Sequence, residues 1–295
     1  MIKYSYVLLG IALFCVACAK KDRETPNGFK YVVLKEGDGV LPKAQEIVVF
    51  DYVLKDSKDS VWNDTHSQGI PAAVPIGDSI MLVQEKGMMQ MFRGLSKGDS
   101  VKASMDMKKF FADIAGGPVP PMIDSTLSIA YYIKVVDVLS RDEFAEFQTK
   151  LMHDMEGKQK TKDAAAITKY LSDKNIKAEQ DSSGINFVIH KSKGGRKPTV
   201  ENCVEVAYKG TFLENGQVFD QSPKMAFPLG QVIRGWQYAI PKLGIGDSAT
   251  FYVPSGLAYG PQGSPGAIPP NSIMIFDVTL LGVGDGFDQG TGTCK

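Results

Sequence analysis

The chain has few of the residues from which metal centres and nucleic-acid interfaces are built. Only three of its 295 residues are histidine, and His66, His153 and His190 show none of the spacings typical of zinc ligands. Lysine plus arginine balances aspartate plus glutamate at 33 each, so no net positive field would attract nucleic acid. The sequence also lacks a phosphate-binding loop and a dinucleotide fingerprint. We therefore expect no metal, no cofactor and no nucleic-acid partner.

Long apolar runs are scarce too, and the one near the N-terminus is typical of a leader. A single cation precedes an apolar run at residues 6–17, which has the length of a signal h-region and is short for a membrane span. Val-Ala-Cys at residues 16–18 resembles the end of a bacterial lipobox, which predicts a signal peptide at residues 1–18 and lipid attachment at Cys18. Ala-Cys-Ala at residues 17–19 also fits ordinary signal peptidase.

These two interpretations predict different locations. The lipobox places the protein in the bacterial cell envelope, as an outer-membrane lipoprotein that faces the periplasm or the surface and contacts the membrane through its lipid anchor. Ordinary cleavage makes it a soluble periplasmic or secreted protein. Outside the leader, only Cys203 and Cys294 remain. An oxidising compartment would permit a disulfide between them, but a sequence cannot place two Cα atoms close together, so a bridge and two free thiols both stay open.

Two parts of the chain repeat each other in the same order. Residues 28–35 are echoed at 184–191, and residues 87–100 are echoed at 235–248. Echoes at both ends and in the middle of so long a stretch indicate a duplicated domain rather than a solenoid of small units. The sequence therefore predicts two tandem domains.

The domain boundaries follow from these repeats and from composition. We expect a first domain at residues 27–139, a helical linker at 140–182, a second domain at 184–283 and a flexible tail at 284–295. The linker begins with a capping box and carries two apolar stretches at helical spacing, which predicts two helices that pack on the domains. The apolar positions are Phe144, Phe147, Leu151 and Met155 in one stretch, and Ala164, Ile167, Tyr170 and Leu171 in the other.

Each domain is predicted to be α+β, with an antiparallel sheet wrapped on a short helix. From Val204 to Tyr208, alternate residues are apolar, which is the period of a strand with one buried face. Asn-Gly at residues 215–216 predicts a tight hairpin turn. The helix expected at residues 233–240 must be short, because Pro241 cannot continue it.

The second domain contains aromatic and apolar motifs in a distinctive order. They are Val-Glu-Val-Ala-Tyr-Lys-Gly at 204–210, Gly-Gln-Val-Phe-Asp-Gln-Ser at 216–222, Pro-Leu-Gly-Gln-Val-Ile-Arg-Gly-Trp at 228–236, Leu-Ala-Tyr-Gly at 257–260, Ala-Ile-Pro-Pro-Asn-Ser at 267–272 and Ile-Met-Ile-Phe-Asp-Val at 273–278. This series resembles the FKBP-type peptidyl-prolyl cis-trans isomerases, in a tandem-domain bacterial lipoprotein form. The resemblance implies that each domain has the FKBP fold and that the second domain is catalytic.

The resemblance also assigns roles within the second domain. Trp236 would form the floor on which a proline ring sits, while the Tyr259 hydroxyl and the Ile268 N–H would bind substrate carbonyls. Asp220 would orient Tyr208 or oppose the carbonyl of the rotating bond. The walls would come from Tyr208, Phe219, Val232, Ile233 and Phe276. A dry aromatic pocket suits this chemistry, since a catalyst of amide rotation needs only to bind the twisted amide better than the planar one.

Some positions depart from the family pattern. Met225 stands at an aromatic wall position, Ser264 where a histidine is common and Ala267 where an isoleucine is common, which argues against macrolide affinity more than against turnover. The first copy departs further and is expected to have little or no catalysis. In it, Met88 replaces the tryptophan, Asn63 or a neighbour replaces the aspartate, Trp62 stands at the phenylalanine position, Phe110-Phe111 occupies the tyrosine loop, and Tyr52 and Tyr131 are kept.

The function expected from the sequence is therefore prolyl isomerisation of unfolded or partly folded polypeptides during the folding of exported proteins. The alternative is a non-catalytic binding or holdase module of FKBP fold in the cell envelope. A scaffold without clients is a third possibility.

Overall fold

The computed structural model describes residues 21–78, 85 and 87–295. The predicted signal peptide at residues 1–18 and the lipid attachment site at Cys18 lie outside these residues. The chain divides into two compact units, Met1–Leu151 and Met152–Lys295. No helix in the described ranges combines the length and the hydrophobicity needed to cross a membrane.

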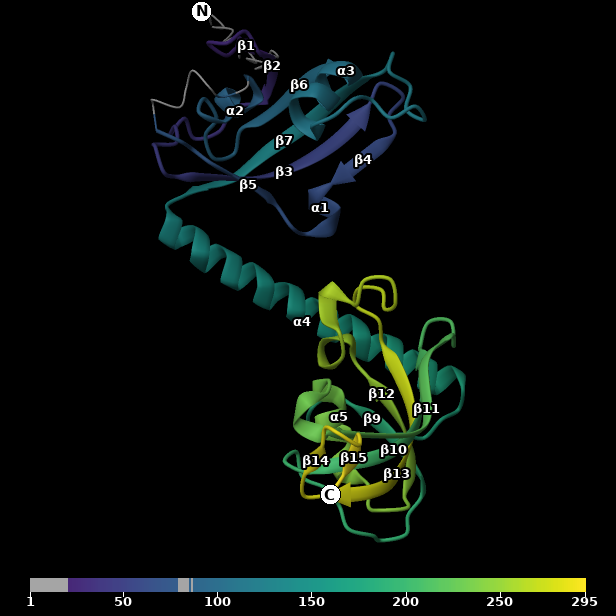
Figure 1. Ribbon diagram of the computed structural model, residues 1–295. Coiled ribbons are helices and arrows are strands. Elements are labelled where there is room, and N and C mark those ends of the chain that lie inside the picture. The colour runs from purple at the N-terminus through teal and green to yellow at the C-terminus, as the bar shows by residue number, and fades with distance from the viewer. Residues whose placement is uncertain (1–20, 79–84, 86) are drawn as a thin grey trace, which may run out of the picture. The chain divides into compact units, whose positions relative to one another are not determined.

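Unit 1 (Met1–Leu151) contains a seven-stranded antiparallel sheet (Figure 1). Its strands, in spatial order, are β1 (Lys21–Glu24), β2 (Lys30–Lys35), β6 (Ser100–Asp106), β7 (Ser128–Leu139), β3 (Ile47–Asp56) and β4 (Val61–Asp64), and β5 (Ala72–Pro75) also pairs with β3. The short helices are α1 (Thr65–Gln68), α2 (Gly87–Phe92), α3 (Met107–Phe110) and the π-helical turn η2 (Phe111–Ala115). The sheet begins earlier than the expected boundary at residue 27, because β1 pairs with β2.

Unit 2 (Met152–Lys295) contains a six-stranded antiparallel sheet with one short helix packed on it. The strands, in spatial order, are β11 (Val218–Pro228), β10 (Cys203–Phe212), β13 (Met274–Gly284), β12 (Ser248–Val253), β9 (Asn186–Lys191) and β8 (Glu179–Gln180). Helix α5 (Arg234–Ala239) buries Trp236 and Ala239 against the sheet, and the chain then tightens into a 3-10 turn at Ile240–Lys242. The predicted α+β class is correct.

The two sheets have the same strand order. Reading inward from β1 or from β8, each strand of one sheet has a counterpart in the other, and β4 with β5 corresponds to the single strand β11. Tyr52 pairs with Ile133 across β3 and β7, and Tyr208 pairs with Val278 at the matching place across β10 and β13. This shared register supports the predicted duplication.

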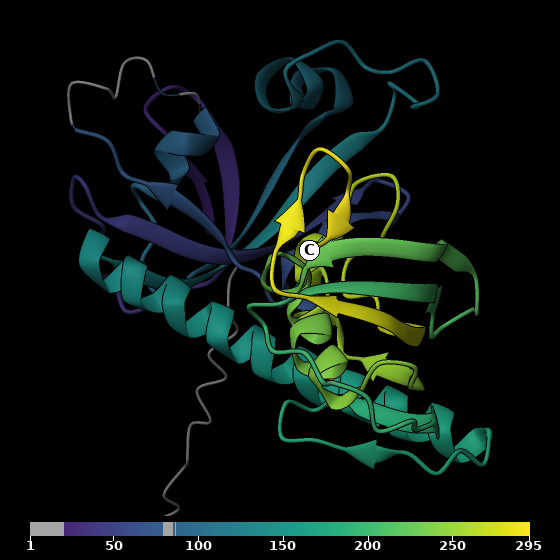
Figure 2. The same cartoon turned by 60° about the horizontal axis from the view of Figure 1, so that its bottom comes forward.

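The region between the sheets is a single helix, α4 (Arg141–Asp173), so the prediction of two linker helices is wrong. Figure 2 shows α4 as one uninterrupted ribbon. The two apolar stretches are separated by polar residues with high helix propensity and contain no proline, and Gly157 weakens a helix without ending it. The predicted capping box is confirmed, because the Glu143 carboxylate accepts from the Ser140 N–H at 2.8 Å and the Glu143 N–H donates to the Ser140 hydroxyl at 3.3 Å.

The second half of α4 is part of unit 2. Ile167 and Leu171 are buried against Tyr252 of β12 and Ile275 of β13. Each such aliphatic side chain contributes about 1.5–3 kcal/mol when it leaves water. Unit 2 therefore begins well before residue 184, where the sequence predicted that the second domain starts.

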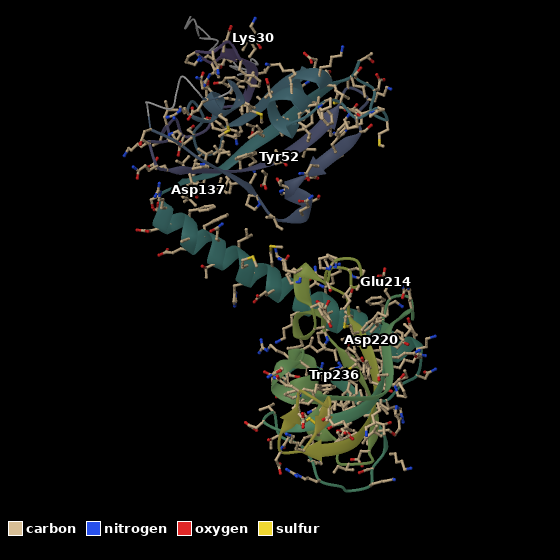
Figure 3. The ribbon with its side chains drawn as sticks, in the orientation of Figure 1. Lys30, Tyr52, Asp137, Glu214, Asp220 and Trp236 are labelled. Atoms are coloured by element: carbon tan, nitrogen blue, oxygen red, sulfur yellow. A yellow bond between two sulfur atoms is a disulfide. The ribbon has the colours of Figure 1, made fainter. Side chains whose placement is uncertain are left out.

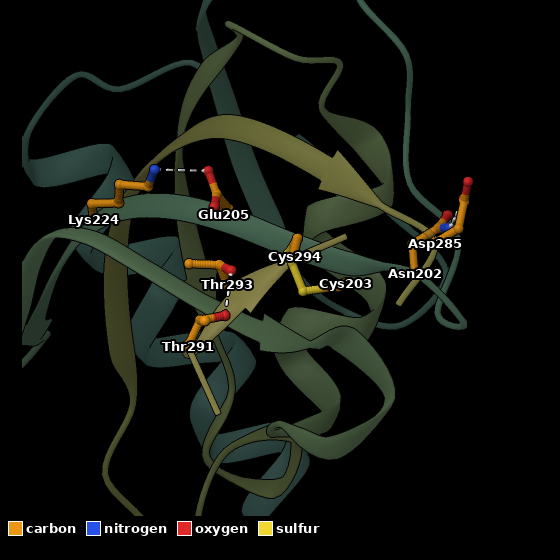
Figure 4. Close-up of a disulfide and its surroundings, with 8 residues drawn as sticks. All are labelled: Asn202, Cys203, Glu205, Lys224, Asp285, Thr291, Thr293 and Cys294. Atoms are coloured by element: carbon orange, nitrogen blue, oxygen red, sulfur yellow. Dashed lines mark hydrogen bonds and ion pairs between the residues drawn. A yellow bond between two sulfur atoms is a disulfide. The ribbon is translucent and has the colours of Figure 1, made fainter. Parts of the chain in front are cut away.

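The segment 284–295 is ordered, so the prediction of a flexible tail is wrong. It forms a hairpin of β14 (Phe287–Asp288) and β15 (Thr293–Cys294), and Cys294 is bonded to Cys203 at the start of β10 with 5.5 Å between Cα atoms. Figure 4 shows the bridge beside β10. The hairpin ends are held further by an ion pair of 3.0 Å between Lys295 and Asp288.

Candidate active site

The indole of Trp236 lies at the centre of an aromatic cluster in unit 2. The ring planes of Tyr208 and Phe276 stand at 83° and 82° to the indole plane, with centroids 5.0 and 5.2 Å away. The Phe227 ring is tilted by 44° from the indole plane, and the two ring centroids are 5.2 Å apart. Edge-to-face contacts of this kind are the favoured geometry of aromatic pairs. Trp236 keeps 7% of its surface exposed, so the indole is mostly buried among the rings that surround it.

The floor also has an unusual polar atom. The indole Nε1 of Trp236 is buried and donates to no group in the described ranges. Leaving a buried donor without a partner costs about 1–3 kcal/mol. Such groups are rare enough in folded proteins to mark a position as one of interest.

Tyr208 and Asp220 are joined by a short hydrogen bond. The Tyr208 hydroxyl donates to Asp220 Oδ2 at 2.5 Å, from β10 to β11. Burial, and then the bond to Asp220, raise the pKa of the Tyr208 hydroxyl well above its ordinary range. The phenol is therefore protonated at neutral pH, and it holds the exposed carboxylate of Asp220 in one orientation. Figure 3 marks Asp220 and Trp236 in unit 2.

Two residues of β11 lie on the same side of the strand beside this pair. Met225 is 46% exposed, and its sulfur lies 3.8 Å from the Tyr208 hydroxyl. Phe227 contacts the indole directly, although no role was predicted for it. The alternation of strand side chains could have indicated it, because residues two apart share a face.

Phe219 packs at the far side of the cluster. Its ring meets Phe276 edge to face, with centroids 5.7 Å apart at 88°, and lies 5.0 Å from the ring of Phe212. It also fits against Gly210, where an added Cβ would come within 2.5 Å of the ring. The structure thus brings together Tyr208, Phe219, Asp220, Trp236 and Phe276, with Val232 and Ile233 packed against the same core.

Tyr259 lies on the loop that follows β12. It is 41% exposed, and its hydroxyl has no hydrogen-bond partner among the residues that the structure describes. The predicted role of this hydroxyl, donation to a substrate carbonyl, needs such an unpaired donor and stays a prediction.

Ile268 is placed differently from its predicted role. Its N–H donates to the Ser264 carbonyl at 2.8 Å and its carbonyl accepts from the Ser264 N–H at 2.8 Å, so the donor assigned to substrate is already paired. The loop folds back on itself through Gly263, which has a φ of +60° and no room for a side chain beside the Ile268 carbonyl. The side chain of Ile268 remains part of the core under the site.

Ile233 has an unpaired backbone N–H, whereas the N–H of Ile268 is already bonded to Ser264. Its N–H precedes α5 and bonds to no acceptor within the described part of the chain, because the first residues of a helix have no carbonyl one turn earlier. Sequence reasoning assigned this residue only to the wall. The sequence did contain a signal for this donor, because Pro241 predicts a short helix and the first N–H groups of a helix have no partner within it.

Unit 2 resembles a known protein family in sequence. Residues 194–281 match the family described as FKBP-type peptidyl-prolyl cis-trans isomerase. FK506-binding protein 1 of Saccharomyces cerevisiae is 44% identical over 115 residues, which are 37% of this chain and 93% of that protein. The chain belongs to the FKBP-type peptidyl-prolyl cis-trans isomerases.

Two bacterial relatives match this isomerase over a stretch of similar length. The probable FKBP-type peptidyl-prolyl cis-trans isomerase FkpA of Neisseria meningitidis is 42% identical over 107 residues, which are 35% of this chain and 39% of the relative. The peptidyl-prolyl cis-trans isomerase Mip of Coxiella burnetii is 42% identical over 106 residues, which are 35% of this chain and 46% of the relative. The family match at residues 194–281 covers β10, β11, α5, β12 and most of β13.

Unit 1 of this isomerase keeps part of the same arrangement. The Asn63 amide donates to the Tyr52 hydroxyl at 2.7 Å, at the strand register where Tyr208 meets Asp220. Trp62 precedes Asn63 as Phe219 precedes Asp220, and its indole donates to Asp56 at 3.0 Å. Tyr131 lies 5.4 Å from Tyr52 between ring centroids. A neutral amide in unit 1 thus stands where unit 2 has the carboxylate of Asp220.

Next to Met88, where unit 2 has its tryptophan, unit 1 contains a cavity of about 380 Å³. Apolar and charged side chains share its walls, including Phe29, Met105 and Lys109. Met88 itself is half-buried. The indole of Trp236 thus corresponds to a methionine side chain in unit 1.

Proposed function

We propose that this isomerase rotates Xaa-Pro bonds of exported polypeptides at the aromatic cluster around Trp236. The aromatic rings packed around the indole support this placement more than any other observation, because a dry aromatic site suits the rotation of an amide. Its substrates are proline-containing polypeptides, as the family requires.

The reaction needs no nucleophile and no net proton transfer. Amide resonance gives the bond a rotational barrier of about 18–20 kcal/mol, and the twisted transition state has lost that resonance. Its carbonyl is less polar than that of the planar amide, so a dry aromatic site penalises the twisted form less than the planar one. Unaided exchange takes tens to hundreds of seconds, which is slow enough to limit folding.

We infer that two donors hold the substrate backbone on either side of the proline. The Tyr259 hydroxyl and the Ile233 N–H are both without partners among the described residues, and each would donate to a substrate carbonyl. Asp220, oriented by Tyr208, would face the carbonyl of the rotating bond. Fixed polar groups of this kind need no rearrangement when the amide twists.

The test of this site is isomerisation of short Xaa-Pro peptides by the full chain. Tyr208→Phe removes the bond to Asp220 and is expected to lower kcat/KM about tenfold, because a misoriented group in a fixed site weakens catalysis strongly. The matched control is Tyr52→Phe, which removes the corresponding hydroxyl in unit 1 and should leave kcat/KM unchanged.

Equal losses in the two variants would show that the site is misplaced. A parent chain that binds such peptides without accelerating their isomerisation would leave the non-catalytic binding function in its place. Unit 1 keeps the Tyr52–Asn63 pair but lacks the aromatic floor, and we propose that it is a degenerate FKBP domain with little or no turnover of its own.

We also propose that the protein works outside the cytoplasm and is held there by a lipid on Cys18. The Cys203–Cys294 bridge supports export, since disulfides persist in oxidising compartments. Mass spectrometry of the mature N-terminus from bacterial membranes is expected to show a diacylated cysteine at position 18. An unmodified alanine or lysine as the first residue would exclude the anchor.

A further inference from the structure

A buried carboxyl group of α4 contacts the loop that carries Tyr259. Asp163 is only 2% exposed, and its Oδ2 accepts from the Ser255 N–H at 2.7 Å and from the Ser255 hydroxyl at 2.6 Å. Its Oδ1 accepts from the Gln159 amide at 2.6 Å. Both oxygens are therefore satisfied, which is the condition under which such a group can be buried.

Asp163 lies on the face of α4 that packs on the sheet. The face repeats every four residues through Gln159, Asp163, Ile167 and Leu171. The last two are buried against β12 and β13, and this contact places Asp163 at the end of β12, where Ser255 begins the loop. An aspartate on an apolar face is costly unless it has specific partners, and here the two bonds to Ser255 provide them.

Ser255 links Asp163 to the loop that carries Tyr259 and to the helix that bears Trp236. It is fully buried and begins the 3-10 turn Ser255–Leu257, in which its carbonyl accepts from the Ala258 N–H at 2.9 Å. Tyr259 follows directly. The Leu257 carbonyl also lies 3.2 Å from where a Cβ on Gly235 would be, so the turn packs closely on the helix that bears Trp236.

We propose that Asp163 is a positioning residue of the isomerase. By fixing Ser255, it sets where the Tyr259 loop begins, so that the linker helix α4 contributes to turnover by the site in unit 2. This inference rests on the site proposed above, because Asp163 acts through Tyr259 and touches no substrate.

The test is steady-state kinetics of the full chain with Asp163→Ala, Asp163→Asn and Leu171→Ala. The alanine variant frees Ser255 and is expected to lower kcat/KM about tenfold. The asparagine variant still has an oxygen that can accept from Ser255. Its NH2 group can donate to the Gln159 side-chain carbonyl once that amide turns over, so the variant should retain at least about a third of kcat/KM. Leu171→Ala loses packing on the same face without touching the loop, so it should lower Tm while changing kcat/KM less than about twofold.

All assays are run at a temperature at which circular dichroism shows every variant to be folded. A second measurement combines Asp163→Ala with Tyr259→Phe. If Asp163 acts through the loop, the losses of kcat/KM in the two single variants do not multiply. The kcat/KM of the double variant is then less than about twofold below that of Tyr259→Phe alone. Multiplying losses, unchanged kcat/KM in Asp163→Ala, or an equal loss in Leu171→Ala would each overturn the inference.

Failure of the inference and failure of the proposed site can be told apart. If Tyr208→Phe lowers kcat/KM and Asp163→Ala does not, only the positioning role is wrong. If the parent chain shows no acceleration, or Tyr208→Phe is as active as the parent, the site is wrong and the role of Asp163 fails with it.

Discussion

Gly210 of β10 lies directly against the ring of Phe219. A Cβ at this position would lie 2.5 Å from the ring, which is already confined by Phe212 and Phe276. The position of the Phe219 ring thus depends on a residue that has no side chain of its own.

At this scale we predict that Gly210→Ala displaces the Phe219 ring. Overpacking of this kind costs about 1–3 kcal/mol of unfolding free energy, and kcat/KM should fall several-fold. Thermal unfolding and peptide isomerisation measure the two effects. The control is Gly157→Ala in α4, where a Cβ has open space and replacing glycine in a helix stabilises by about 1 kcal/mol. A Gly210→Ala chain as stable and active as the parent would contradict this account of Phe219.

The short hairpin of β14 and β15 is fixed covalently to β10 by the Cys203–Cys294 disulfide. It lies beside β10 and β11, the strands that carry Tyr208 and Asp220, and the bridge from Cys294 to Cys203 spans 91 residues of sequence. A cross-link over so long a loop restricts the unfolded chain more than the folded one.

We expect reduction of this bridge to lower the unfolding free energy of unit 2 by about 2–4 kcal/mol. The measurement is thermal unfolding of the full chain with and without a phosphine reductant. The double variant Cys203→Ser, Cys294→Ser should unfold at the lower temperature in both conditions. Identical melting of the parent chain with and without reductant would show that the bridge does not stabilise the fold.

Across the whole molecule, the features foreseen from the sequence are those with local or repeated signals. The short α5 and the capping box at Ser140 each follow from a few neighbouring residues. The duplication, inferred from a comparison of the chain with itself, stays a prediction with which the shared strand order agrees. The Tyr208–Asp220 pair was foreseen because the family motif and the hairpin turn fix which residues of two strands face each other.

The features that were missed depend on contacts between distant residues or on the path of a loop. The sequence left open whether Cys203 and Cys294 form a bridge, and the bond from Asp163 to Ser255, over 92 residues, leaves no pattern in it. The N–H of Ile268 is occupied because the loop closes on Ser264, and no local motif shows this. The single helix α4 was divided by mistake because polar residues and Gly157 separate its two apolar stretches.

The docking of α4 on its own sheet has a practical consequence for preparing the catalytic half alone. A recombinant fragment cut at residue 184, where the repeat begins, would lack Ile167 and Leu171 and would leave Tyr252 and Ile275 uncovered. Apolar surface newly exposed to solvent favours self-association of the fragment. Inhibitor screening or crystallisation of this half therefore calls for a fragment that starts upstream of Gln159.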